Sequence, residues 1–129
     1  MINMKKIFLL AGLGWLLMSF TVQSDTENII NSLKLGDAKA VAAYFDAYID
    51  LTLPGKDDIK NIGKNQAGIT LKSFFDDVGV NGFDLTSQRE SGNTMYIAGK
   101  LQTKDKGYNI TMLLKNRDGK HQIISVRIN

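Results

Sequence analysis

Acidic and tyrosine side chains are the residues of this sequence that could do chemistry together, and they gather in one short stretch. Asp46, Tyr48 and Asp50 lie within Asp46–Leu53, which alternates as a β-strand with Tyr48 and Asp50 on one face. A carboxylate can remove a proton while a phenol stabilises the oxyanion that forms, so an Asp–Tyr pair could support acid–base catalysis. Carboxylates are also common on exposed strand faces, and we interpret Asp50 as such a surface residue. No residue is therefore assigned a catalytic role.

A second candidate group lies on the C-terminal strands of the chain. Tyr96 and Tyr108 fall on adjacent predicted strands, and Arg127 falls on a flanking one. Tyr and Arg are enriched in ligand pockets and partner surfaces, so these three join Tyr48 and Asp50 as candidate ligand-binding residues. The alternative is cross-strand packing that only shields the sheet, which we favour for the two tyrosines.

Several classes of site are not expected from the composition. His121 is the only histidine and cysteine is absent, so we expect no His-based zinc site, no thiol catalysis and no disulfide. We expect His121 to lie exposed beside a turn, and we expect no cofactor. Without Lys5 and Lys6, the 16 basic residues become 14 against 13 acidic ones, which leaves a net charge of +1. No basic patch remains, so nucleic acid is not an expected partner.

The N-terminal stretch has the composition of a secretory signal peptide. Lys5 and Lys6 precede an apolar run, Ile7–Phe20, and small residues follow as far as Ser24. We expect residues 1–24 to be removed, residues 25–129 to form a single domain, and the protein to be periplasmic or secreted. No membrane contact is expected after cleavage. The alternative is an N-terminal anchor that is retained in the membrane.

The C-terminal third predicts a meander of antiparallel strands, because alternating apolar residues are separated by turns that contain Gly beside Asn or Asp. The expected strands are Phe83–Ser91, Thr94–Lys104, Tyr108–Lys115 and Gln122–Ile128. In the last strand, alternation places Ile124, Val126 and Ile128 on one face and Ile123, Ser125 and Arg127 on the other. The first group is expected to face the core.

The N-terminal half supplies the elements that must cover this sheet. Ser24 and Glu27 form a capping box at a first helix that ends at Gly36, and Asp37 caps a second helix over Ala38–Phe45. A third helix runs from Lys64 or Asn65 to Gly79, and we expect at least one of its paired phenylalanines, 74 and 75, to be deeply buried. Lys56–Lys64 is expected to be a loop or an irregular hairpin. These elements predict an α+β fold with helices on one face of a curved, mostly antiparallel sheet.

This order of elements resembles the nuclear-transport-factor-two-like superfamily, also called cystatin-like or SnoaL-like. The mature chain more closely resembles an exported bacterial family known only as domain of unknown function 4783. The segments that carry the resemblance are Tyr44–Asp46, Ile49–Lys56, Phe74-Phe75, Tyr96–Leu101, Thr103, Tyr108 and Val126–Ile128. The resemblance implies a cone-like fold of three N-terminal helices on a curved sheet, and it implies no activity. Superfamily isomerases pair an Asp base with an oxyanion-holding Tyr or Asp, but those positions do not map residue by residue onto this chain.

Two hypotheses about function follow. The first is an exported, non-enzymatic domain that binds a small ligand, peptide or protein partner through its cavity or its outer sheet face. The alternative is a small isomerase- or hydrolase-like enzyme with an Asp/Tyr acid–base pair in the cone cavity. The outer face also suggests a weak homodimer, with Ile123 and a tyrosine at its apolar centre and Lys100 and Arg127 at its rim. A monomer is the alternative to that dimer.

Overall fold

The computed structural model describes residues 24–129, and the expected signal peptide lies almost entirely outside these residues. The fold is α+β and combines three helices with a six-stranded sheet in the described part. The helices are α2 (Asp25–Lys34), α3 (Ala38–Ala42) and α4 (Lys64–Val78). The strands are β1 (Phe45–Thr52), β2 (Ile59–Gly63), β3 (Gly82–Ser91), β4 (Thr94–Gln102), β5 (Gly107–Arg117) and β6 (Lys120–Ile128). No helix within residues 24–129 has the length and apolar character to cross a membrane.

The helix ends follow the capping signals in the sequence. The backbone N–H of Glu27 donates to Ser24 Oγ over 3.2 Å, which completes the capping box at the start of α2. The Asp37 carboxylate accepts from Ala40 N over 3.0 Å and starts α3. At its C-terminus, α4 ends at Gly79, whose φ of +73° is the left-handed conformation that glycine adopts without strain. The structure confirms the predicted starts of the three helices and the end of α4 at Gly79, but α3 ends at Ala42 and not at Phe45, which is the first residue of β1.

The sheet order is β2-β1-β6-β5-β4-β3, and the four C-terminal strands form the predicted antiparallel meander. Strand β1 lies beside β6 and runs parallel to it, so the sheet is mixed. Part of the segment that we expected to be a loop or irregular hairpin, Lys56–Lys64, forms β2, which pairs antiparallel with β1 at the sheet edge. The expectation of three N-terminal helices holds only for α2 and α3, since α4 follows two strands of the sheet.

A register shift in β6 changes which residues face the core. Leu113 pairs with Ser125, but Leu114 pairs with Ile123, so Ile124 is an extra residue in the ladder. Because this bulge interrupts the alternation, Ile123 turns to the core face and is fully buried. The prediction that Ile123 lies on the outer face with Ser125 was therefore wrong, and the proposed dimer patch loses its apolar centre.

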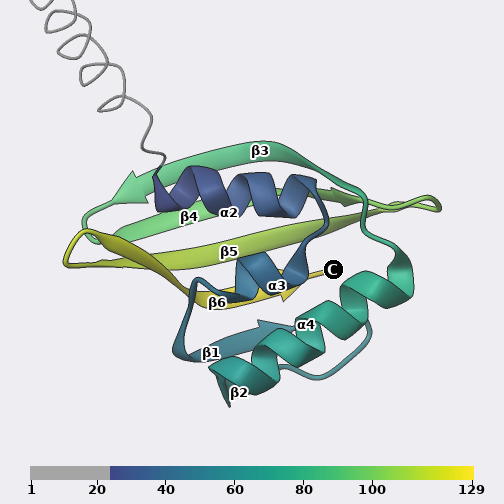
Figure 1. The fold of residues 1–129 in the computed structure, drawn as a ribbon, viewed down its shortest axis with the longest axis horizontal. Coiled ribbons are helices and arrows are strands. Elements are labelled where there is room, and N and C mark those ends of the chain that lie inside the picture. Colours follow the sequence, from purple (N-terminus) through teal and green to yellow (C-terminus); the bar gives the residue numbers. More distant parts are fainter. Residues whose placement is uncertain (1–23) are drawn as a thin grey trace, which may run out of the picture.

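All three helices cover one face of the curved sheet, and the core lies between the two layers (Figure 1). Helix α4 contributes Ala67, Leu71 and Phe75 to this core, and Phe75 is only 2% exposed. Phe74 is partly buried, and its ring packs edge-on against Tyr108 with centroids 5.4 Å apart. The prediction that at least one phenylalanine of this pair is deeply buried is confirmed.

One glycine fixes how the helical layer meets the sheet. Gly36, between α2 and α3, has a φ of +67°, and a Cβ built on it would overlap the backbone carbonyl oxygen of Val80. Val80 lies in the short connection between α4 and β3. The corner between the first two helices therefore sits directly against the connection that leads into the meander.

Candidate functional site

The structure brings four of the five predicted ligand-binding residues to the outer face of the sheet. Tyr96 pairs with Leu113, Leu113 with Ser125, and Ser125 with Asp50, so Tyr96 and Asp50 lie in one row that crosses β4, β5, β6 and β1. Arg127 occupies the next row, where it pairs with Thr111 on one side and Thr52 on the other. Tyr48 lies on β1 two residues before Asp50 and is 61% exposed. These residues share a face without forming a compact site.

Two of these polar side chains hold the β1–β2 hairpin. The Asp50 carboxylate accepts from Asn61 N over 2.9 Å, and Asn61 has a φ of +58° within an irregular stretch of the β1–β2 ladder. Arg127 Nη2 lies 3.7 Å from Asp58 Oδ2, and Asp58 Oδ1 accepts from the Thr52 hydroxyl over 2.9 Å. Asp50 and Arg127 thus secure the polar segment that follows β1, a structural role that their sequence positions did not reveal.

The two C-terminal tyrosines lie on opposite faces of the sheet, so they cannot line one pocket together. Tyr96 is on the outer face, where the Arg89 guanidinium lies 5.6 Å from the centre of its ring. Tyr108 is on the helix-covered face, where it packs against the core beside Phe74. Lys106 Nζ lies 4.9 Å from the centre of the Tyr108 ring. Each ring makes a cation–π contact, which fits the packing role that we favoured.

The two acidic residues of β1 do not meet a tyrosine in the described part of the chain. Asp46 Oδ2 accepts from Arg117 Nη2 over 3.0 Å, and Asp46 Oδ1 accepts from Ala47 N over 2.8 Å. Asp50 bonds Asn61 N and has a side chain that is 48% exposed. Within residues 24–129, no group of three or more His, Cys, Asp or Glu side chains is arranged to hold a metal ion.

His121 is more buried than the sequence suggested. Its side chain is 16% exposed, and its Nε2 lies 3.8 Å from Glu90 Oε2, so the expectation of an exposed histidine was wrong. Its backbone N–H donates to Asp25 Oδ2 over 2.9 Å and joins the start of β6 to the start of α2. This contact holds the N-terminal end of α2 against the start of β6.

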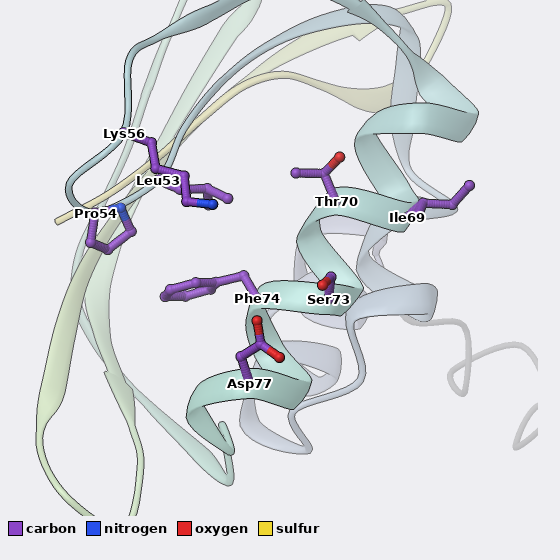
Figure 2. Close-up of a pocket in the computed structure, with 8 residues that line it drawn as sticks. All are labelled: Leu53, Pro54, Lys56, Ile69, Thr70, Ser73, Phe74 and Asp77. Carbon is purple, nitrogen blue, oxygen red and sulfur yellow. The ribbon is translucent and has the colours of Figure 1, made fainter.

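A cleft between α4 and the segment after β1 is the site that sequence reasoning missed (Figure 2). It has a volume of about 290 Å³. Leu53, Pro54 and Phe74 give it an apolar floor, and Figure 2 shows the Phe74 ring reaching from α4 toward Leu53 and Pro54. The polar groups around it are Lys56, Thr70, Ser73 and Asp77, while Ile69 points away from the centre.

The sequence held one signal for this cleft. Thr70, Ser73 and Asp77 recur at helical spacing beside the apolar stripe of α4, which places them along one edge of the helix. The partner wall comes from the Pro54-Gly55 turn, and sequence alone did not show that this turn faces α4. On the opposite side of the helix, the Asp76 carboxylate raises the pKa of Lys72, first through a 2.6 Å hydrogen bond and then through charge attraction.

Comparison with known sequences decides the family. The sequence profile of the domain of unknown function DUF4783 matches residues 26–129. This range includes all the helices and strands described above except Asp25, the first residue of α2. The chain belongs to the DUF4783 family. No curated protein matches it.

Solved structures with the same fold come from DUF4783 and from NTF2-like proteins. A DUF4783 protein from Bacteroides uniformis has a TM-score of 0.75 and 22% identity, over 82% of this chain and 96% of that one. One from Bacteroides ovatus has a TM-score of 0.70 and 22% identity, over 78% and 90% of the two chains. An NTF2-like protein of unknown function from Cytophaga hutchinsonii has a TM-score of 0.56 and 13% identity, over 85% and 93%. These matches bear out the resemblance to both groups.

Proposed function

We propose that this DUF4783 domain is an exported, non-enzymatic binding protein that takes a small ligand into the cleft between α4 and the Leu53–Lys56 segment. The observation that carries the proposal is the composition of the cleft, an apolar floor ringed by polar groups from two separate elements. Ligand sites commonly have this construction, because apolar contacts supply affinity and a few polar groups fix orientation.

The floor of the cleft is held in place before any ligand arrives. Phe74 packs edge-on against both Phe75 and Tyr108, with centroid distances of 6.4 and 5.4 Å. A ring that two aromatic neighbours already hold in place loses little conformational entropy when a ligand covers it, so binding is opposed less. Tyr108, which was predicted as a ligand-binding residue, would then contribute indirectly, by packing against Phe74 and holding its ring in place.

The rim of the cleft suggests what kind of molecule fits. Lys56 and Asp77 carry opposite charges, and Ser73 adds a hydroxyl next to Phe74 on α4. A volume of about 290 Å³ suits a small molecule. We therefore propose a compact ligand with an apolar body and at least one polar or charged group. The alternative of an Asp/Tyr enzyme has less support, because the Asp46 and Asp50 carboxylates bond Arg117 and Asn61 instead of a tyrosine.

Export is the part of this proposal that protein chemistry can test directly. The basic pair Lys5-Lys6, the apolar run after it and the small residues up to Ser24 motivate cleavage in this region. Intact-mass measurement of the protein from its own host is expected to give a first residue between Val22 and Thr26, in the periplasmic or secreted fraction. Recovery of the uncleaved chain from membranes would contradict export as a free protein.

Filling the cleft should abolish ligand retention without disturbing the fold. Ser73 is exposed on α4, so Ser73→Trp places a large ring over the Phe74 floor and removes no core contact. Native mass spectrometry of protein purified from its own host is expected to show a bound small molecule on the wild type, at least tenfold depleted in Ser73→Trp. Gln66→Trp, which adds the same ring at an exposed position of α4 outside the cleft, is the control and should retain the molecule. Equal retention by both variants would refute this site.

A further inference from the structure

A second concave surface lies on the other side of α4, between that helix and α3. It is a groove of about 710 Å³. Ala42 and Ala43 form its floor on the α3 side, and Gly68 forms it on the α4 side. A Cβ on Gly68 would lie 3.1 Å from Ala42 Cβ, so the two helices meet almost backbone to backbone. Small residues therefore line the floor of the groove, and Ile69, 63% exposed, forms one apolar wall.

The charged side chains that line this groove are all positive. Lys39, Lys64 and Lys72 line it, and no acidic side chain does. Lys72 is partly neutralised by Asp76, 2.6 Å away, whereas Lys64 Nζ donates only to the carbonyl oxygen of Ala43 over 3.3 Å. Lys39 makes no ion pair within the part of the chain that the structure describes. The unbalanced positive charge therefore belongs to Lys39 and Lys64.

The start of α4 adds to this positive charge at the Lys64 end. Its N-cap residue is Gly63, which offers no side-chain acceptor, and its first turn holds no acidic residue. The first N–H groups of the helix are therefore left without a side-chain partner, and the helix dipole places partial positive charge there. From Lys64 to Lys72 the groove follows α4 for about 12 Å, at the rise of an α-helix.

We propose that this groove binds a single-chain amphiphile with an anionic head. The alkyl chain lies along the floor and against Ile69, where it covers apolar surface that is otherwise left in water. The head, a carboxylate or a phosphate, lies beside Lys64 and the first N–H groups of α4. Charge complementarity favours an anion, and the floor of small residues favours one extended chain over a peptide with bulky side chains.

Two substitutions separate the contributions of the head and the chain. Lys64→Glu reverses the charge at the head position, and a glutamate in the first turn of α4 suits the helix dipole, so the fold should keep its thermal stability. Calorimetric titration with dodecanoate below its micellar concentration is expected to show binding about tenfold weaker than in the wild type. Ile69→Ser, at the exposed wall, is expected to weaken it about fivefold.

Matched controls make each effect specific to the groove. Lys115→Glu carries the same charge change on an exposed β5 position, and Leu35→Ser removes an aliphatic side chain that is 78% exposed at the end of α2. Both should bind dodecanoate like the wild type. The cleft-filling variant Ser73→Trp should also bind it normally, so a failure of the proposed function leaves this test intact.

Three results would overturn the proposal. Dodecyltrimethylammonium carries a cationic head on the same alkyl chain length. If it binds as tightly as dodecanoate, the lysines do not select for an anionic head. Equal weakening by Lys64→Glu and Lys115→Glu would show a general charge effect. Binding of a peptide of alternating Glu and Leu, with no binding of dodecanoate, would assign the groove to a protein partner instead.

Discussion

Replacing Phe75 with alanine is expected to lower the free energy of unfolding by about 3–5 kcal/mol. The Phe75 side chain is 2% exposed and lies in the core between α4 and the sheet, so its removal leaves a cavity that rigid neighbours cannot fill. A loss of this size approaches the whole stability of a small domain. Urea unfolding followed by far-ultraviolet circular dichroism measures the difference between the variant and the wild type.

The neighbouring residue provides the control. Phe74→Ala removes the same atoms from a ring that is only partly buried, so the expected loss is about 1–2 kcal/mol. The difference between the two variants reports which face of α4 the sheet covers. Losses below about 1 kcal/mol for both would contradict the packing of this helix on the sheet.

The second large effect is expected at Gly36. A Cβ at this position would overlap the carbonyl oxygen of Val80, and the φ of +67° disfavours any side chain. Gly36→Ala should therefore force apart the α2–α3 corner and the connection before β3, with a loss of about 3 kcal/mol. The same urea titration measures this loss, and a lowered thermal midpoint should accompany it.

Gly55 separates the two causes of that loss. Its φ of +72° matches that of Gly36, but no atom lies within 4 Å of a Cβ built there. Gly55→Ala therefore reports only the conformational cost, about 1 kcal/mol. If the two alanine variants lose equal stability, the close approach of Gly36 to Val80 adds nothing to the cost of a side chain at position 36.

Local patterns predicted the parts of this fold that are made locally. The meander follows from alternating side chains and from the turns at Gly92 and Gly119, each beside an Asn or Asp, and both signals act within a few residues. The helices follow from side chains that bond the backbone nearby, such as Ser24 and Asp37, and from the apolar stripe of α4. The order of these elements predicted that the helices cover one face of a curved sheet.

The remaining features depend on contacts between distant residues. The bulge at Ile124 is visible only when β6 is aligned against β5, because Ile123 and Ile124 are equally apolar in sequence. Strand β2 forms because β1 offers it an edge, and its own residues are mostly exposed. The cleft likewise needs the Pro54 turn to face Thr70 and Ser73, which no local pattern specifies. Candidate-site prediction therefore found polar residues on the sheet and missed the concave surfaces beside α4.

The parallel pairing of β1 with β6 has a consequence for how the chain folds. Phe45 and Ile123 are register partners although most of the domain separates them in sequence. Such high contact order slows folding, because the chain must lose the conformational entropy of a long loop before the β1–β6 pairing can stabilise it. The meander can form first from adjacent hairpins, leaving β6 as an unpaired edge until β1 arrives. During that interval the partly folded chain exposes a strand that other chains can join, so a holding chaperone should raise its refolding yield.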